Sequence, residues 1–337
     1  MKKIFLSLLL SLLIVPGYAQ EEEAPAVRED AFLAQKEIAV WRTDKVSEGR
    51  ASVYACQAVR IQPQWLLTAA HCVYQACQGP SGILPCTVEV TLAEAELRQR
   101  ARVLNTTASK NVFIYGGFSL GQNRISSLDV ALVRLDPQNT GYTYEKWNDK
   151  EKQWEEISKK QFDAQLFHSP ETKAQLSAAF PRLISVAGLS SSSRLLPQIV
   201  VPRITNGEVS YLISPSMDVF FVQELQHFIS PGFGVRRGNS GGGVFTAAGD
   251  LTGLVSSLIY SRNGSASFQN EEGKTVLTLQ NARDYFLFTG FNAETMNFIR
   301  NHVPNLRVIG AENGFVEPTD KPFTDIVKTI NQTSLSL

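Results

Sequence analysis

Three short stretches carry most of the information in this chain: Leu-Thr-Ala-Ala-His-Cys at residues 67–72, Asp-Val-Ala-Leu at 129–132 and Gly-Asn-Ser-Gly-Gly at 238–242. Each contains one member of a set of three reactive side chains in an apolar or glycine-rich setting. The three side chains are an imidazole, a carboxylate and a hydroxyl. Because they are far apart in the sequence, they can act together only if the fold brings them together.

The three residues are His71, Asp129 and Ser240. A serine hydroxyl is a poor nucleophile at neutral pH unless a base takes its proton, and the base needs a carboxylate to hold its ring in one tautomer. Taken singly, each residue also has a structural interpretation: a core histidine, a turn-capping aspartate and a serine in a glycine-rich turn. The three together indicate nucleophilic catalysis.

The local settings suit these roles. His71 ends an apolar run, and the small alanines before it leave room around an imidazole. Asp129 starts an apolar strand, where a half-buried carboxylate needs a hydrogen-bond partner. Gly238 frees the backbone two residues before Ser240, so we expect the amides of Gly238 and Ser240 to form an oxyanion hole.

Length and charge narrow the protein class. The chain has 337 residues and no net formal charge. At roughly 150 residues per domain, two domains are expected. A neutral chain lacks the basic surface that nucleic acids require, so we expect no nucleic-acid partner. Nothing in the sequence implies a cofactor, and the oligomeric state is open.

The first 19 residues resemble an export signal. Lys2 and Lys3 precede an apolar run over 4–15, and Gly17-Tyr18-Ala19 is a small-x-small cleavage site. The run stops at Pro16, short of the roughly 20 residues that a membrane-spanning helix needs. We therefore expect an exported protein, periplasmic or extracellular, with no stable membrane anchor after signal cleavage.

Four cysteines allow three disulfide connectivities. We favour Cys56–Cys72, beside His71, and Cys77–Cys86, which closes a small loop. Export to an oxidising compartment permits both bonds. The alternative is a metal site, but a Cys-X4-Cys spacing without additional histidine ligands fits zinc poorly, so no metal is expected.

The chain between these motifs is rich in short β-type runs, which favour a barrel or sandwich over βαβ units. The predicted strands cover 52–61, 65–69, 87–92, 102–105, 112–115, 129–135, 183–187, 198–204, 208–213, 219–225, 243–246, 251–259, 275–279 and 285–288. Residues 247–250 predict a hairpin turn.

Domain boundaries follow from composition. We expect a signal peptide (1–19), an acidic linker or pro-segment (20–37), a first β-barrel (38–140), a charged and partly helical connector (141–180), a second barrel with a C-terminal helix (181–305) and a polar tail (306–337). The connector contains a charged stretch, 144–160, and the spacing of Trp154, Ile157, Phe162 and Leu166 predicts a surface helix in it. Asn292 is expected to cap a helix that ends near His302.

Together the three stretches resemble the His, Asp and Ser motifs of the trypsin/chymotrypsin-like serine peptidases, in that order, over about residues 38–305. The Gly-Asn-Ser-Gly-Gly string is similar to bacterial members. Gly253-Leu254-Val255-Ser256 resembles the family's substrate-lining strand, and Cys56–Cys72 its bridge beside the histidine. The resemblance implies an all-β fold of two six-stranded antiparallel β-barrels with a C-terminal helix.

The resemblance also implies roles. Ser240 is the expected nucleophile, His71 the base and Asp129 the orienting acid of a serine endopeptidase acting on proteins or peptides through an acyl-enzyme. Gly238 and Ser240 supply the oxyanion hole. Ser256 supports Asp129 and borders the specificity pocket.

Two departures from the family pattern matter. Asn239 stands where the family's activation switch has an aspartate, and no Ile-Val-Gly-Gly string precedes His71. Gly234, at the pocket floor, carries no charge to select Lys or Arg. A modest apolar side chain is the expected substrate preference. An acidic one is the second choice, through the pair Arg236 and Arg237, or through His227 if it faces the pocket.

Two other classes compete. Gly-x-Ser-x-Gly also fits the nucleophile elbow of an esterase, with Ser240, Asp284 and His302 in the required order. That fold needs a helix after the serine, whereas 243–246 predicts a strand. A non-catalytic binding protein that keeps a protease fold is the other alternative.

Overall fold

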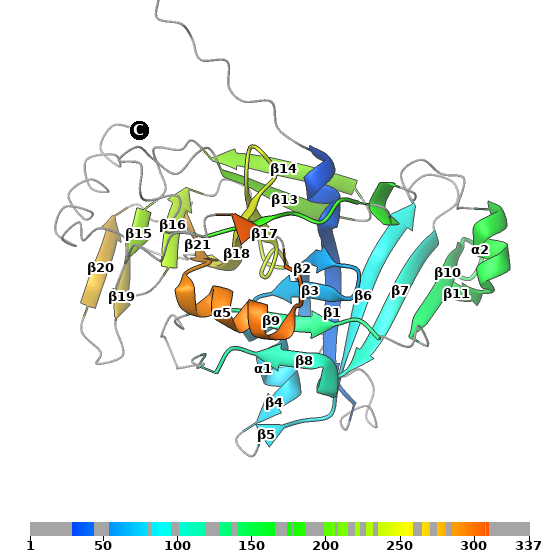
Figure 1. Ribbon diagram of the computed structural model, residues 1–337. Coiled ribbons are helices and arrows are strands. Elements are labelled where there is room, and N and C mark those ends of the chain that lie inside the picture. Colours follow the sequence, from blue (N-terminus) through cyan, green and yellow to red (C-terminus); the bar gives the residue numbers. More distant parts are fainter. Residues whose placement is uncertain are drawn as a thin grey trace, which may run out of the picture.

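The computed structural model describes residues 29–43, 54–79, 82–95, 101–116, 118, 128–136, 141–165, 174–176, 178–185, 199–205, 208–214, 220–222, 227–231, 235–258, 265–269, 275–280, 285–306 and 308–309. These residues form two large, mainly antiparallel sheets with few helices (Figure 1). The expected signal peptide and most of the expected tail lie outside them. No helix in the described part is long and apolar enough to span a membrane.

The first sheet has nine strands in the order β11-β10-β7-β6-β1-β2-β3-β9-β8. The strands are β1 (Gln35–Arg42), β2 (Tyr54–Gln62), β3 (Trp65–Thr68), β6 (Cys86–Ala95), β7 (Ala101–Ala108), β8 (Val112–Ile114), β9 (Ala131–Arg134), β10 (Tyr142–Asn148) and β11 (Gln153–Ile157). β-Branched residues such as Ile38, Val88 and Val103 pack inside it.

A bend closes this sheet into a barrel. β7 pairs with β6, the 3₁₀ turn η3 (Ser109–Asn111) redirects the chain, and β8 then pairs with β9. One continuous segment therefore joins the two sides of the barrel. The hydroxyl of Thr107 donates to the Arg134 carbonyl across the same closure, at 3.0 Å.

The second sheet has the order β14-β13-β17-β18-β21-β16-β15. In addition, β12 pairs with β18, and β22 pairs with β12. Its strands are β12 (Leu183–Ile184), β13 (Ile199–Thr205), β14 (Glu208–Ser214), β15 (Phe220–Val222), β16 (His227–Pro231), β17 (Gly243–Thr246), β18 (Leu251–Leu258), β21 (Tyr285–Gly290) and β22 (Val308–Ile309). Two small two-stranded sheets complete the described strands: β4 (Gln78–Gly79) with β5 (Gly82–Ile83), and β19 (Ser265–Gln269) with β20 (Thr275–Gln280). Phe228 stacks on Phe288 inside the second barrel.

Helix α5 (Ala293–His302) follows the second sheet, as expected for a C-terminal helix. The Asn292 side chain accepts a hydrogen bond from the Thr295 amide at 2.9 Å and so satisfies one of the free amides of the first turn. The expected hairpin turn is also present: the Gly249 amide donates to Thr246 O, and Gly249 has a φ of 81° that favours glycine.

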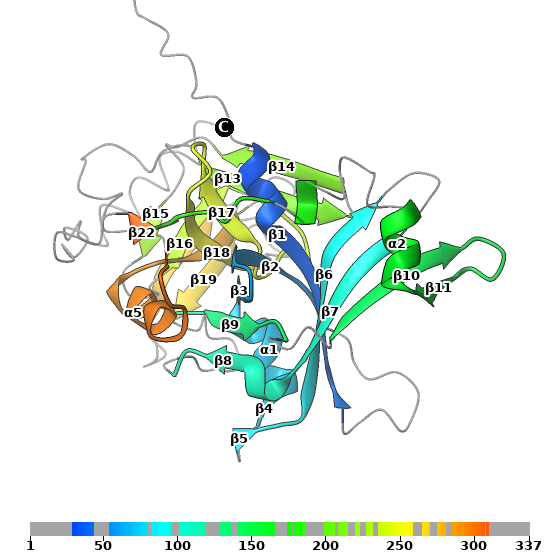
Figure 2. The same ribbon diagram turned by 45° about the vertical axis from the view of Figure 1, so that its right-hand side comes forward.

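The two barrels share an apolar seam, and the N-terminal segment lies in it. The 3₁₀ helix η1 (Glu29–Ala34) sits beside β13 and β14 in both views (Figures 1 and 2). Phe32 is fully buried and packs edge-on against Phe245 of β17 at 5.3 Å. The fold therefore begins earlier than residue 38, because 29–37 belongs to η1 and β1 and only the rest of the expected linker lies outside the described residues.

The predicted helix in the connector is only partly confirmed. Residues 142–157 form the hairpin β10–β11, which extends from the β7 edge away from the second sheet (Figure 2), and α2 (Lys159–Gln165) is helical. Trp154 and Ile157 lie in β11, whereas Phe162 lies in α2. Trp147 pairs directly with Trp154 across the hairpin, with ring centroids 5.4 Å apart, and such cross-strand aromatic pairs stabilise a sheet.

Phe32→Ala tests the seam. Removing a fully buried phenylalanine leaves a cavity, so we expect the free energy of unfolding in urea to fall by about 3–5 kcal/mol. Tyr54→Ala is the control, because Tyr54 is an exposed aromatic residue of the same barrel, and its change should stay within about 0.5 kcal/mol. Equal losses in both variants would contradict the buried role of η1.

Candidate active site

His71 is positioned by the junction of β3 and α1 (Ala70–Cys77). Ala69 and Ala70 are fully buried at this junction. The next residue, Cys72, is bonded to Cys56 of β2, and the second disulfide joins Cys77 to Cys86, so both pairings are those we favoured. The first bond ties the start of α1 to the sheet beneath it.

Asp129 lies in a tight turn just before β9. The Val130 amide donates to Leu128 O at 2.8 Å, which curls the chain around the aspartate. Leu128 has a φ of 56°, a region that non-glycine residues rarely adopt and that costs about 1–3 kcal/mol. This strained residue directly precedes Asp129, and no local sequence pattern predicts it.

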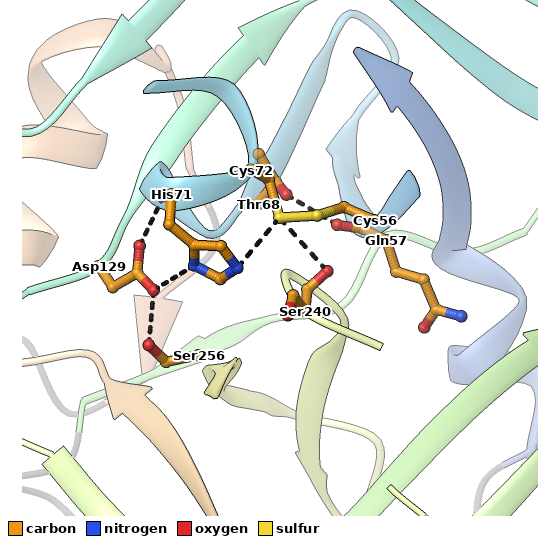
Figure 3. Close-up of a disulfide and its surroundings, with 8 residues drawn as sticks. All are labelled: Cys56, Gln57, Thr68, His71, Cys72, Asp129, Ser240 and Ser256. Carbon is orange, nitrogen blue, oxygen red and sulfur yellow. Dashed lines mark hydrogen bonds and ion pairs between the residues drawn. A yellow bond between two sulfur atoms is a disulfide. The ribbon is translucent and has the colours of Figure 1, made fainter. Parts of the chain in front are cut away.

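Two hydrogen bonds join His71 to Asp129. The His71 amide donates to Oδ1 at 2.9 Å, and Nδ1 donates to Oδ2 at 2.7 Å. An ionised carboxylate only accepts, so Nδ1 carries the proton and Nε2 is the acceptor in the neutral ring. Figure 3 shows the imidazole with Asp129 on one side and Ser240 on the other.

Ser256 supplies a third donor from the second barrel. Its hydroxyl donates to Asp129 Oδ2 at 2.5 Å. The register of β18 against β21 shifts between Val255 and Ser257, so Ser256 sits in an irregularity of the strand. Bulges of this kind re-aim a side chain, here toward Asp129.

The pKa values of the pair are shifted in opposite directions. Burial raises the pKa of Asp129, but the charge of His71 and the hydrogen bonds from His71 and Ser256 outweigh it and leave the pKa below its ordinary value. Burial lowers the pKa of His71, but the charge and hydrogen bond of Asp129 outweigh it and raise the pKa. Asp129 is only 2% exposed, whereas the His71 side chain is 31% exposed and accessible.

Ser240 lies in a turn that holds itself in place. The Asn239 side chain accepts a hydrogen bond from the Arg236 amide at 2.8 Å, and the Gly242 amide donates to Asn239 O at 3.0 Å. Gly238 has a φ of 91°, which favours glycine. No hydrogen bond from the Gly238 or Ser240 amide to another described main-chain group is present.

The structure brings Ser240 next to His71. The Cys72 sulfur lies 3.7 Å from His71 Nε2 and 3.7 Å from the carbonyl oxygen of Ser240. The Gln57 amide donates to that same carbonyl at 2.8 Å. The serine loop of the second barrel is thus fastened to the barrel that carries His71.

The expected specificity residues fall in different places. Gly234 lies outside the described residues, whereas Arg236 and Arg237 are exposed beside the serine turn. His227 is fully buried in β16, where Nε2 lies 3.3 Å from the Thr289 hydroxyl. A buried His227 does not face an open pocket, so the structure gives no support to its selecting acidic substrates.

The esterase arrangement is not favoured. β17 follows the serine turn, so the strand–elbow–helix unit is absent at Ser240. His302 lies at the end of α5, donates from Nδ1 to Phe298 O at 2.9 Å and packs against Phe113. Asp284 lies outside the described residues.

Among the described residues, one cluster places potential metal ligands together: Cys56, His71 and Cys72. The two sulfur atoms are bonded to each other in a disulfide and are not thiolates. Since the thiolate is the metal-binding form of cysteine, this cluster does not fit a metal ion.

Comparison with known proteins identifies the family of this chain. The family model described as Trypsin matches residues 39–270, more than half of the chain. The fold and the site define a chymotrypsin-like double β-barrel with a C-terminal helix. The chain belongs to the trypsin family of serine peptidases.

A search of solved structures gave matches at low identity and low TM-score. An HL collagenase matches with a TM-score of 0.44 at 14% identity, covering 80% of this chain and 93% of the collagenase. A mutant of human heparin binding protein matches at 0.41 and 12%, covering 82% and 96%. An inactivated protease paralogue of the scabies mite matches at 0.38 and 13%, covering 83% and 96%. The search of curated proteins gave no match.

Titration of His71 by NMR tests the pair. We expect a pKa above 6.5, because the charge of Asp129 stabilises the protonated ring. In Asp129→Asn that charge is gone while the burial remains, so the pKa should fall below 6.5. His71→Gln assigns the resonance. An unchanged His71 pKa in Asp129→Asn would contradict the pairing.

The same shift predicts a pH dependence of stability. A raised folded-state pKa of His71 stabilises the protein fully below the unfolded value of about 6.5, and this contribution is lost as the pH rises through the folded pKa. The free energy of unfolding should therefore decline more steeply over this range in the native sequence than in His71→Gln. Parallel curves for the two proteins would disprove the linkage.

Proposed function

We propose that this protein is a serine endopeptidase that hydrolyses peptide bonds of proteins or peptides through an acyl-enzyme. Ser240 Oγ attacks the carbonyl carbon, and His71 Nε2 takes the hydroxyl proton and then delivers it to the leaving amine. Water repeats the attack on the ester with His71 as base, which releases the acid and restores Ser240. Asp129 holds the ring and stabilises the imidazolium.

The observation that carries the proposal is the hydrogen bond from His71 Nδ1 to Asp129 Oδ2. It fixes the tautomer in which Nε2 can accept a proton, and Nε2 is the ring atom nearer to the Ser240 segment. Burying a carboxylate costs desolvation free energy, and a purely structural histidine does not need a buried charge with three donors. A histidine that accepts and releases a proton does need a fixed charge beside it.

The oxyanion hole is assigned to the amides of Gly238 and Ser240. The positive φ of Gly238 and the hydrogen bonds of the turn support this assignment. Donors fixed in advance need no reorganisation as the charge develops on the carbonyl oxygen, and one such donor is worth about 3–4 kcal/mol in the transition state.

The turn also supports a bacterial-type enzyme that needs no freed N-terminus for activity. Asn239 is uncharged, and its side chain bonds to Arg236 within the turn. A local hydrogen bond of this kind can replace an ion pair with a distant terminus. Any pro-segment would therefore lie before η1, because Phe32 is part of the seam between the barrels.

We propose that the protein is exported and acts in the periplasm or outside the cell. Both disulfides support an oxidising compartment, since such bonds are rare in the cytosol. The substrates are then proteins or peptides in that compartment. No cofactor enters the proposed chemistry.

Ser240→Ala tests the nucleophile. The variant keeps the turn and the His71–Asp129 pair but lacks the attacking oxygen, so kcat should fall by a factor of about 10⁶ with an unchanged thermal midpoint. A fluorophosphonate probe should label the native protein at Ser240 and leave the variant unlabelled.

Two outcomes would redirect this assignment. A native protein that neither cleaves peptides nor reacts with the probe would favour the non-catalytic binding protein. Activity lost in His302→Ala and kept in His71→Ala would favour the esterase. The described contacts of His302 are with α5 and Phe113, so we expect the reverse result.

A peptide-library cleavage profile tests specificity. We expect cleavage after modest apolar residues, because Gly234 lacks a counter-charge for Lys or Arg. Exposed Arg236 and Arg237 make acidic residues the second choice. If the second choice applies, Arg236→Ala with Arg237→Ala should remove that preference. Dominant cleavage after Lys or Arg would overturn both expectations.

A further inference from the structure

We infer that Gln35 is a positioning residue for the proposed peptidase: its buried carboxamide bridges the two barrels and sets Ser240 against His71. The inference rests on the proposed function and adds a residue that none of the three sequence motifs contains. Gln35 is the first residue of β1 and is fully buried in the described structure.

The Gln35 side chain fills a gap in the second barrel. Its Oε1 accepts a hydrogen bond from the Gly243 amide at 2.9 Å, and its Nε2 donates to Pro202 O at 2.6 Å. Gly243 begins β17, three residues after Ser240, and Pro202 belongs to β13. One carboxamide of the first barrel thus joins two strands of the second.

The gap has a cause in the sequence. β13 and β17 pair through Ile199–Thr246 and Val200–Phe245, and the same register would place Pro202 opposite Gly243. Proline has no N–H and cannot donate to Gly243 O, so the ladder would keep at most the bond from the Gly243 amide to Pro202 O. The carboxamide of Gln35, which has the donor and acceptor of a peptide group, satisfies Gly243 and Pro202 instead.

A second glutamine extends the bridge to Ser240. Gln35 Nε2 also donates to Oε1 of Gln57, a buried residue of β2. The main-chain amide of Gln57 donates to Ser240 O at 2.8 Å, and its carbonyl accepts from the Thr68 hydroxyl at 2.7 Å (Figure 3). Thr68 ends β3, directly before the junction that carries His71.

The serine turn approaches this network closely. A Cβ at Gly241 would lie 2.2 Å from Gln57 O, and Gly241 has a φ of 79°. A Cβ at Gly242 would lie 2.8 Å from Gln57 Oε1 and 3.1 Å from Gln35 Nε2. The backbone of the serine turn therefore passes close to the carboxamides of Gln35 and Gln57. We expect a shift of either side chain to displace the turn.

Glutamine is the residue that this place requires. Both Nε2 hydrogens and the Oε1 of Gln35 are used, on Gln57, Pro202 and Gly243. An ionised glutamate would lack the two donors and bury a charge. Methionine has a similar size but leaves three buried partners without their bonds.

Gln35→Met tests the inference, with Gln62→Met as the matched control. Gln62 lies on β2 and also bonds to a carbonyl, that of Pro304, but at an exposed position away from the serine turn. In Gln35→Met we expect kcat per fluorophosphonate-titrated site to fall about 10- to 100-fold, with KM within about threefold of the native value. Gln62→Met should match the native protein in both constants.

The pH profile separates positioning from general damage. The His71–Asp129 pair lies in the first barrel, so the apparent pKa of the acidic limb of kcat/KM should be the same in Gln35→Met and the native protein. Native kcat per titrated site in Gln35→Met would overturn the inference, even if the thermal midpoint falls.

Gln57→Met provides a second route if Gln35→Met does not fold. It removes the side-chain link to Gln35 and keeps the main-chain bond to Ser240. We expect a lower kcat with unchanged KM, and in the double variant a loss no larger than that of Gln35→Met alone. Native kcat in Gln57→Met would overturn the inference. A native protein without probe labelling or hydrolysis would instead refute the proposed function.

Discussion

The rest of the site depends on one buried carboxylate. Asp129 is almost completely removed from solvent, and an isolated charge there would be strongly destabilised. Its oxygens receive the His71 amide, His71 Nδ1 and the Ser256 hydroxyl. Two donors come from the first barrel and one from the second. The two bonds from His71 form within the first barrel, and the Ser256 bond adds a link that forms only where the two barrels meet.

The N-terminal segment reinforces the same interface by different means. Phe32 contributes apolar contact with Phe245, and Gln35 contributes three directional bonds a few residues later. Apolar contact stabilises the seam without fixing its register closely, since it has no preferred direction. Hydrogen bonds from a fully buried carboxamide do fix it, because each unmade bond would leave a desolvated polar group. Stability and alignment at the seam thus come from neighbouring but separate residues.

Much of this could be predicted from the sequence where one local pattern dominates. β17 follows the serine string with its predicted bounds, and Asn292 caps α5 as expected. The hairpin 142–157 could not be recognised, because Trp154 and Ile157 of β11 share a helix-like spacing with Phe162 of α2. β1 was hidden within an acidic stretch, since Gln35 and Lys36 are polar yet buried. Gln35 bonds to distant strands, and Lys36 donates to the carbonyls of Leu33 and Gln175, partners that no local pattern reveals.

In the serine turn, the groups that hold the backbone are different from the side chains that are exposed to a substrate. Its hydrogen bonds run to Asn239 within the turn, to Gln57 of the first barrel and to Val255 of β18, where Gly241 donates at 2.7 Å. All three anchors hold the backbone, and none uses the exposed side chains of Arg236 and Arg237. Substitutions at these arginines can therefore alter the charge offered to a substrate while the amides of Gly238 and Ser240 stay in place. Gly241 and Gly242 have no such freedom, because a Cβ at either position would come too close to Gln57.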